Sequence, residues 1–227
     1  SIKILCIIPA RDGSKGISDK NIMDFRGKPL LSWSIEHAQQ SKYSKNMKII
    51  VSTDSEKYAE ISKQYGADVP FLRPKNISGD TSSDYECMKH CVDWLKENEN
   101  YEPDIILHLR PTQPCRKVEH VNSAIETFIN HRDEYDSLRS VIPVEKSPYK
   151  MYSIDNDELK PLFDKVNNIK EPYNHARQLL PQSYLHNGYI DIFNTEIMTN
   201  NTISGNKIYP FVMDMDNNID IDEEKDI

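Results

Sequence analysis

A basic, glycine-bearing loop follows the first apolar run of the chain and contains the residue types that bind phosphate. It lies within residues 7–21, which read IIPARDGSKGISDKN. Glycine lets the backbone come close to a phosphate, backbone N–H groups donate to its oxygens, and cations offset its charge. The two glycines and three cations are Gly13, Gly16, Arg11, Lys15 and Lys20. This pattern favours a polyphosphate site.

The loop matches neither of the two best-known glycine motifs. Walker A requires a Lys and then Ser or Thr directly after its second glycine, whereas here Lys15 precedes Gly16. The sequence also lacks the dinucleotide fingerprint G-x-G-x-x-G. Spacing alone therefore leaves a second interpretation open, in which the loop is a solvated turn between a strand and a helix.

Two carboxylates near the end of the sequence have the spacing of a metal-binding pair. In an extended strand, Asp220 and Asp222 lie on the same side, roughly 6–7 Å apart along the chain. Mg²⁺ prefers one or two carboxylates together with phosphate oxygens and water. The pair therefore predicts a Mg²⁺ site, and the alternative is an acidic, solvated tail.

Two later segments offer polar side chains for a second ligand. The segment 110–116 reads RPTQPCR and follows an apolar run, so Arg110 and Arg116 could bind a carboxylate or phosphate bidentately. The alternatives are helix capping and surface ion pairing. A further irregular segment supplies Arg177, Gln182 and Asn187. These three residues suit the wall of a polar pocket, or else belong to an ordinary loop.

Strands and helices alternate over the first two-thirds of the chain, which predicts a parallel α/β sheet with right-handed crossovers. Short apolar runs predict buried strands, and apolar residues at helical spacing predict the helices between them. The expected strands are 3–8, 48–53, 104–109 and 138–144, and the expected helices are 29–41, 55–65, 83–98 and 118–131. Ligands of such sheets bind outside the carboxyl ends of the strands. The loops 9–21, 53–54 and 110–116 are therefore expected to share one rim.

The alternation changes after Val144. A hairpin with an Asn-Asp turn is expected within 148–164, and later strands are expected at 189–193 and 207–213. A length of 227 residues suits one domain with a sizeable core. We interpret residues 1–227 as a single domain with an excursion at about 145–190 that meets a second subunit.

Composition narrows the range of partners. The net charge of −8 argues against nucleic acid or an acidic membrane as a partner. No apolar stretch of the sequence approaches the roughly 20 residues that span a bilayer, so we expect no membrane partner and a cytoplasmic location. Cys87 and Cys91 lie four residues apart, but no second ligand pair has zinc-type spacing. We therefore expect reduced, mostly buried thiols.

These segments together resemble the acylneuraminate cytidylyltransferase family, which makes CMP-sialic acid and related CMP-nonulosonates. The resemblance runs nearly from end to end, and its most specific part is the first motif combined with IDID at 219–222. The matching segments are IIPARDGSKGISDKNIMDFRGKPLLSWSI at 7–35, IIVSTDSEKYAEISKQYGADV at 49–69, FLRPKNISGDTSS at 71–83, LRPTQPCR at 109–116, RQLLPQSYLHNGYIDIF at 177–193 and IDIDEEKDI at 219–227.

The resemblance implies a fold, a reaction and an assembly. The implied fold is a Rossmann-like, mostly parallel sheet flanked by helices, with a small dimerisation excursion, of the nucleotide-diphospho-sugar transferase type. The implied enzyme is a cytidylyltransferase that joins CMP from CTP to a nonulosonic, sialic-acid-like sugar and releases pyrophosphate. Mg²⁺ is the implied cofactor, which would neutralise the reacting phosphate. A homodimer is implied as well.

The resemblance also assigns roles to positions that match the family's motifs. The implied nucleotide-binding residues are Ala10, Arg11, Gly13, Ser14, Lys15, Gly16, Lys20, Asn21, Arg73, Asp80, Thr81 and Ser82. The implied sugar-binding residues are Arg110, Lys150, Arg177, Gln182, Asn187 and Gly188. The implied metal ligands are Asp220 and Asp222. Arg11, Lys20 and Asp222 are expected to be catalytic.

Two departures from the family pattern bear on the sugar. The sialic acid enzymes often have Gln where this chain has Arg110, and Arg-Pro where it has Leu185-His186. Both departures fall on the sugar side, so we expect another nonulosonate, such as a legionaminate-like sugar. Two alternatives stay open: a sugar-1-phosphate nucleotidyltransferase of the same fold that uses another nucleotide such as GTP, and a nucleotide-binding protein without turnover.

Overall fold

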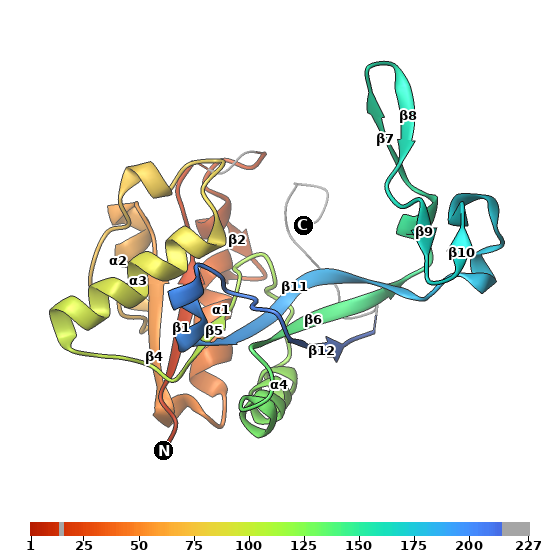
Figure 1. Ribbon diagram of the computed structural model, residues 1–227. Helices are drawn as coiled ribbons and strands as arrows, with labels where there is room; N and C mark the ends of the chain where they lie inside the picture. Colours follow the sequence, from red (N-terminus) through yellow and green to blue (C-terminus); the bar gives the residue numbers. More distant parts are fainter. Residues whose placement is uncertain (14–15, 215–227) are drawn as a thin grey trace.

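A six-stranded sheet forms the centre of the computed structural model, which describes residues 1–13 and 16–214 (Figure 1). Its strands, in spatial order, are β12 (Ile208–Val212), β6 (Ser137–Val144), β11 (Ser183–Asn194), β5 (Ile105–His108), β1 (Ile4–Pro9) and β4 (Met47–Ser52). β1 is parallel to β4 and β5, β12 is parallel to β6, and β11 is antiparallel to both of its neighbours. The predicted mostly parallel sheet is confirmed.

The central strand β1 explains where a ligand can bind. Residues 4–8 are fully buried, as an apolar run in a parallel sheet covered on both faces must be. After β1 the chain pairs β4 on one side of it, and later returns to pair β5 on the other side. This change of direction is the topological switch point at which α/β sheets bind ligands. The loops that follow β1, β4 and β5 share this rim, as the sequence predicted.

Helices cover both faces of the sheet and give the protein three layers (Figure 1). The main helices are α1 (Leu30–Gln40), α2 (Glu56–Gln64), α3 (Asp84–Glu99) and α4 (Val118–His131). Ile35 of α1, Tyr58 of α2 and Phe128 of α4 pack in one core cluster with Ile8. Met88 of α3 packs in a second cluster on the opposite face. Within the described residues, no helix is both long enough and apolar enough to cross a membrane.

Local signals in the sequence fix the starts of the helices that meet the rim. Ser83 caps α3 by accepting from the Glu86 backbone N–H, and the Glu86 side chain accepts from the Ser83 N–H, which forms a capping box. Ser55 caps α2 by accepting from the Tyr58 N–H. Both caps lie close to the rim loops, so these local interactions help to position the polar residues beside them.

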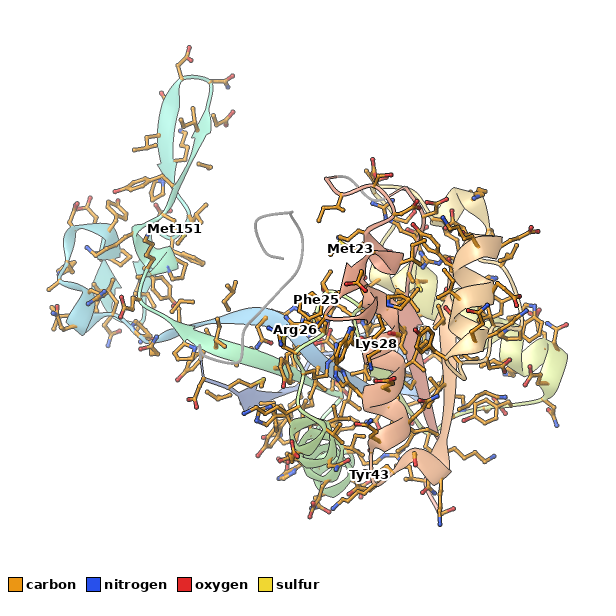
Figure 2. All side chains as sticks on the ribbon, turned by 180° about the vertical axis from the view of Figure 1, so that it is seen from behind. Met23, Phe25, Arg26, Lys28, Tyr43 and Met151 are labelled. Atoms are coloured by element: carbon orange, nitrogen blue, oxygen red, sulfur yellow. The ribbon has the colours of Figure 1, made fainter. Side chains whose placement is uncertain are left out.

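The predicted excursion is a set of short strands carried by the extended ends of β6 and β11 (Figure 1). These strands are β7 (Tyr152–Asp155), β8 (Glu158–Pro161), β9 (Lys165–Val166) and β10 (Ile169–Lys170). Asn156 and Asp157 join β7 to β8 with φ of 50° and 64°, the left-handed values that a tight hairpin turn requires. The predicted Asn-Asp hairpin is therefore confirmed. Figure 2 shows Met151 at the base of this hairpin, far from Met23, Phe25 and Arg26 on the body.

A large bulge interrupts the pairing of β11 with β6. His186 pairs with Val141 and Asp191 pairs with Arg139, so four residues of β11 lie opposite one residue of β6. Ser140 Oγ donates to Asn187 Oδ1 at 2.5 Å and accepts from the Ile190 N–H at 2.9 Å, which fixes the bulge. Bulges redirect side chains. This one brings His186 within hydrogen-bond distance of Asp191.

Candidate active site

A cavity of about 220 Å³ opens at the rim where β1, β4 and β5 end. Its lining combines the glycine loop, the segment before α3 and the loop after β5. The lining residues are Pro9, Arg11, Lys20, Asn21, Arg73, Ser82, Ser83, Asp84, Cys87, His108, Arg110, Pro111 and Thr112. The structure therefore brings together predicted nucleotide residues and one predicted sugar residue, Arg110.

The glycine loop adopts the conformations that its glycines permit. Gly13 and Gly16 have φ of 69° and 93°, in the left-handed region where a side chain is strained. The Asn21 side chain donates to the Arg11 carbonyl at 3.0 Å and so ties the two ends of the loop together. The buried Ala10 donates its N–H to the Ser52 carbonyl of β4. The predicted residues Ser14 and Lys15 lie outside the described residues.

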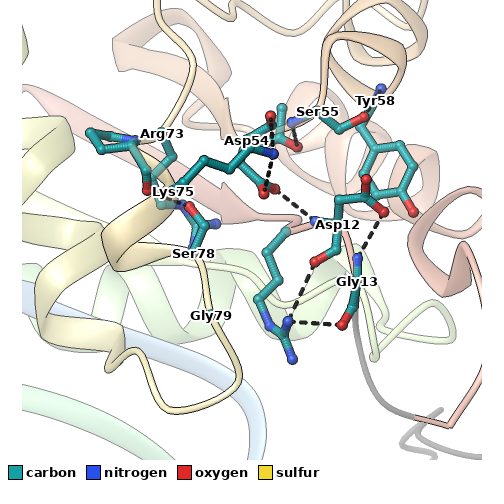
Figure 3. Close-up of polar contacts among 12 residues, drawn as sticks. Asp12, Gly13, Asp54, Ser55, Tyr58, Arg73, Lys75, Ser78 and Gly79 are labelled. Carbon is teal, nitrogen blue, oxygen red and sulfur yellow. Dashed lines mark hydrogen bonds and ion pairs between the residues drawn. The ribbon is translucent and has the colours of Figure 1, made fainter.

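Asp54, at the end of β4, holds the glycine loop in place (Figure 3). Its carboxylate accepts from the Asp12 N–H at 2.8 Å and from Lys75 Nζ at 3.0 Å. Burial alone would raise the pKa of this carboxyl, but the hydrogen bonds from Asp12 and Lys75 outweigh burial and lower it. Asp54 is therefore ionised at neutral pH and anchors the loop by a charge-assisted hydrogen bond.

Two predicted nucleotide residues have partners that fix their direction. Arg11 Nη2 lies 2.9 Å from Asp80 Oδ1, which links the glycine loop to the loop before α3. Arg73 is buried, and its Nε and Nη2 donate to the hydroxyl and carbonyl of Ser52 at 3.0 and 2.8 Å. Thr81 is exposed and is not part of the cavity lining.

Arg110 lies in a cluster of ionisable groups that sequence reasoning missed. Its Nη2 is 2.8 Å from Asp191 Oδ2 and 3.2 Å from Asp84 Oδ2. Burial alone would raise the pKa of Asp191, but the hydrogen bond from His186 and the charge of Arg110 hold it well below its usual range. His108 completes the cluster and is fully buried beside the cavity.

Arg116 does not face a ligand, which corrects the idea that it could bind a carboxylate or phosphate. Its guanidinium is buried and donates to the carbonyls of Tyr189 and Arg110 at 2.8 Å each. It also contacts Ser34 Oγ at 3.1 Å and His37 Nδ1 at 2.9 Å. These contacts join α1, the loop after β5 and the bulge of β11, so Arg116 is a structural residue that supports the rim.

The remaining predicted sugar residues do not all reach the cavity within one chain. Arg177 and Gln182 line a second cavity of about 450 Å³ at the base of the excursion. Lys150 is exposed there and donates to the His175 carbonyl. Asn187 is a buried residue of the bulge, and Gly188 lies so close to Arg110 that a Cβ would be 3.4 Å from Arg110 Cδ. The two cavities share no lining residue, and the excursion lies at the end of β6 and β11 that projects from the body (Figure 1).

The predicted metal ligands Asp220 and Asp222 lie outside the described residues. Within residues 1–13 and 16–214, no group of three or more His, Cys, Asp and Glu side chains is arranged to hold a metal ion. The Mg²⁺ site therefore stays a prediction. Cys6, Cys87 and Cys91 are free and buried, as expected.

Lowering the pH from 7 to 5 is expected to destabilise the fold. Burial, reinforced by the charges of Arg116 near His37 and Arg110 near His108, lowers the pKa of both imidazoles from 6.5 to about 3. The unfolded chain therefore binds protons that the native state does not bind, and stability falls as the pH drops below about 6.5. At 1.36 kcal/mol per pH unit, each residue costs about 2 kcal/mol at pH 5. Urea unfolding at pH 5, 6 and 7 measures this loss, and equal stabilities would contradict it.

A glycine loop at the switch point of a doubly covered sheet, beside a cavity lined by cations, is the arrangement by which α/β proteins bind phosphorylated ligands. The family model described as Cytidylyltransferase matches residues 5–200. The chain therefore belongs to the cytidylyltransferase family, which confirms the family and the enzyme class predicted from the sequence.

Relatives and solved structures agree with this family. The chain is 32% identical over 225 residues to the post-translational flagellin modification protein B of Campylobacter coli, covering 99% of this chain and 92% of that protein. It is also 32% identical over 225 residues to an N-acylneuraminate cytidylyltransferase of Escherichia coli O18:K1:H7, with 99% of this chain but only 50% of that protein covered. It is 38% identical over 157 residues to a CMP-N,N'-diacetyllegionaminic acid synthase of Legionella pneumophila, covering 68% and 64% of the two chains. This chain thus spans about half the length of the Escherichia coli relative.

One solved structure shows the same fold. It is a CMP:2-keto-3-deoxy-manno-octonic acid synthetase complexed with CTP, with a TM-score of 0.67 and 16% sequence identity, covering 98% of this chain and 94% of that one. The likeness confirms the predicted nucleotidyltransferase-type fold.

Proposed function

We propose that this chain transfers CMP from CTP to a nonulosonic acid and releases pyrophosphate. The observation that carries the proposal is the cavity, in which the cations Arg11 and Lys20 of the glycine loop line the same space as Arg73 and Arg110. Relatives named for N-acylneuraminate and for N,N'-diacetyllegionaminic acid support a nine-carbon sugar acid as the acceptor. The family makes CTP the expected donor, in preference to GTP.

The reaction is a displacement at the α-phosphorus of CTP. The anomeric hydroxyl of the sugar acid forms the new P–O bond and its proton passes to solvent water, while the bond between the α-phosphorus and the oxygen that bridges to the β-phosphate breaks and pyrophosphate leaves with that oxygen. Arg11, Lys15 and Lys20 hold the leaving pyrophosphate and stabilise the charge that develops on it. Catalysis is then mainly positioning and electrostatic stabilisation by the chain's own cations.

Mg²⁺ is part of this proposal. Asp220 and Asp222 would hold the ion, which would supply positive charge at the reacting phosphate. The cytoplasmic location also stays a prediction.

The sugar is proposed to be a legionaminate-like nonulosonate instead of N-acetylneuraminate. The support is Arg110, which occupies the position where the sialic acid enzymes often have Gln, and His186, which contacts the same cluster through Asp191. Arg110 lines the cavity, and His186 belongs to β11, the neighbour of β5 in the sheet.

Pyrophosphate release with Mg²⁺ tests the function directly. CTP, GTP, UTP and ATP are crossed with a panel of nonulosonic acids and sugar 1-phosphates. Turnover with CTP and one keto-acid sugar is expected, together with its loss on adding EDTA. Turnover only with a sugar 1-phosphate would overturn the proposed acceptor, and turnover without any divalent cation would overturn the metal assignment.

We further propose a homodimer formed through the excursion. Ile154 and Leu159 pair across the β7–β8 hairpin and are 76% and 61% exposed, and Tyr152, two residues before Ile154 on the same face, is 40% exposed. Neighbouring apolar side chains left this exposed mark a protein interface. A partner there would also explain why Lys150 and Arg177 lie away from the cavity of their own chain, because they could then face the cavity of the partner.

Replacing Ile154 and Leu159 together by Glu is expected to convert the dimer into a monomer and to abolish turnover of the sugar acid. Two buried carboxylates at an apolar interface oppose association by desolvation. Light scattering coupled to size exclusion measures the mass, and Leu72→Glu, at an exposed leucine on the body, is the matched control. An unchanged mass in the double variant would rule out this interface.

A further inference from the structure

The charge of Arg110 is already compensated within the protein. Its Nη2 contacts the carboxylates of Asp191 and Asp84 at 2.8 and 3.2 Å, so one cation faces two anions. The side chain of Asp191 is only 8% exposed, which makes this interaction strong and poorly screened. A substrate carboxylate placed here would meet two fixed carboxylates of the same sign. The cluster is therefore poorly suited to bind a second anion.

The cluster nevertheless contains buried polar atoms without partners. Arg110 Nη1 and both ring nitrogens of His108 form no hydrogen bond within the described part of the chain, and the nearest charged group to His108 Nδ1 is Asp191 Oδ2 at 3.9 Å, beyond hydrogen-bond distance. His108 is 1% exposed, and both residues line the cavity. Buried polar atoms in native proteins are nearly always satisfied, so such atoms beside a cavity indicate a ligand that completes them. A guanidinium donates, and a neutral imidazole offers one donor and one acceptor.

The position of the cluster identifies which part of the reaction it serves. Along the rim, β4 and Arg73 lie on one side of β1, and β5 with β11 lie on the other side. The excursion, with Lys150 and Arg177, is carried by β6 and β11 on that second side. The Arg110 cluster therefore lies between the glycine loop and the excursion, where the acceptor must approach the nucleotide.

We propose that Arg110 and His108 form a subsite that recognises a neutral polar substituent of the acceptor sugar, a hydroxyl or an acylamino group, and that Asp191 and His186 position Arg110 for this task. Such groups donate and accept hydrogen bonds, which matches the unpaired atoms of the subsite. The carboxylate of the sugar is bound elsewhere. This inference rests on the proposed function and adds which substituent of the acceptor sugar the site recognises.

The bulge of β11 is what makes this subsite possible. It places His186 Nε2 2.7 Å from Asp191 Oδ1, while the other oxygen of Asp191 contacts Arg110. Gly188 has φ of 69°, where a side chain would be strained, and lies beside the aliphatic part of Arg110. A site built to hydrogen-bond a substituent rejects an analogue without it far more strongly than an apolar pocket does, because its own polar atoms stay unpaired. Asp191 is thus a positioning residue for specificity.

The test compares kcat/KM between acceptor sugars that differ in their substituents. Nonulosonic acids that share the carboxylate and keto groups but differ in hydroxyl and acylamino substituents are assayed with saturating CTP. In Arg110→Met, the ratio of kcat/KM between the best and the poorest acceptor is expected to fall about tenfold or more, while KM for CTP stays within about twofold. Asp191→Asn is expected to raise the KM of the best acceptor several-fold and leave the KM of CTP unchanged. Lys207→Met, at an exposed ion pair with Glu134, is the control.

Three results would contradict the proposed subsite or the function on which it rests. An equal loss with every acceptor would show that Arg110 binds the shared carboxylate, and would overturn the inference while leaving the proposed function intact. A rise in the KM of CTP alone would place the cluster on the nucleotide side and overturn it as well. If the wild-type chain turned over no sugar acid, the proposed function itself would fail. Stabilisation by CTP in a thermal shift shows that each variant is folded, and Arg110→Gln, which can still donate to Asp191, replaces the methionine variant if that variant melts early.

Discussion

Replacing Arg11 by methionine is expected to lower kcat/KM for CTP by about 10²- to 10³-fold. Arg11 lies at the carboxyl end of the central strand, lines the cavity and leads directly into the glycine loop. In the proposed reaction its guanidinium stabilises the charge that develops on the leaving pyrophosphate. Removing one donor that acts on such a charge costs this much in enzymes where it has been tested, because the donor is strongest in the transition state.

The fold should tolerate this change. The Arg11 side chain is 25% exposed and that of its partner Asp80 is 41% exposed, and ion pairs this exposed contribute at most about 1 kcal/mol to stability. A loss of activity with a nearly unchanged melting temperature would therefore locate the effect in the reaction. Arg11→Lys keeps the charge but not the forked geometry, so it separates attraction from bidentate positioning.

Arg26→Met is the matched control for Arg11. Arg26 is an exposed arginine in the same N-terminal region, and its guanidinium lies 5.0 Å from the centre of the Phe25 ring (Figure 2). It does not belong to the cavity lining. Its variant should keep kcat/KM for CTP within about twofold of the wild-type value. A similar, small loss in both variants would remove Arg11 from the proposed catalytic set.

Sequence patterns were sufficient for the parts of the site that are local. A buried run that ends in Pro9, followed by two glycines, predicts a strand and a loop with left-handed backbone without help from the rest of the chain, whereas the phosphate-binding role of the loop rests on the family resemblance. The capping residues Ser55 and Ser83 fix two helices in the same local way. The family resemblance then added the roles of residues such as Arg73, whose position depends on a contact with Ser52 on a distant strand.

The Arg110 cluster could not be predicted because it depends on tertiary structure. Asp191 lies in YIDIF, an apolar strand, where a charged residue at a buried position was the available signal. Its partner His186 is reached only through the bulge, and β11 starts at Ser183, well before the expected strand at 189–193. The first half of that strand is largely exposed, so it lacks the alternation that would have identified it.

For the excursion, the local structure was predictable from the sequence but the placement of its residues was not. Its hairpin was predictable from the Asn-Asp turn, but the direction in which it projects is set by the length of β6 and β11. The resemblance assigned Lys150, Arg177 and Gln182 to the sugar, yet the structure places Arg177 and Gln182 at a second cavity of the same chain. In the proposed dimer these residues would face the sugar in the cavity of the partner, and no pattern within one sequence specifies such an assembly.

Replacing Arg116 by methionine is expected to destabilise the fold by about 3–5 kcal/mol and to lower the melting temperature by roughly 6–20 °C. Methionine retains much of the aliphatic volume but none of the donors. The Tyr189 carbonyl and His37 Nδ1 would lose the group that they contact, and each buried polar group left unpaired costs about 1–3 kcal/mol. The Arg110 carbonyl would keep its hydrogen bonds from the Ser34 hydroxyl and the Gln113 N–H.

The loss of stability in Arg116→Met is expected to be large because the partners of Arg116 belong to different elements of the fold. Tyr189 belongs to the bulge, Arg110 to the loop after β5, and Ser34 to α1, so a single guanidinium joins three elements that meet behind the cavity. Arg116→Lys is expected to be nearly as damaging, because one ammonium cannot reach partners arranged around a planar fork. Arg132→Met is the control, since Arg132 is only half-buried and its side chain donates to Asn194 alone among the described contacts.

Calorimetry on the three variants distinguishes structure from chemistry at this position. Addition of saturating CTP should stabilise the Arg116 variants by the same increment as the wild type if the cavity re-forms, because ligand linkage adds to whatever stability remains. A methionine variant with a wild-type melting temperature and no response to CTP would mean that Arg116 acts on the nucleotide and not on the fold. The buried geometry predicts the reverse, since Nε, Nη1 and Nη2 of the buried Arg116 each contact a protein atom.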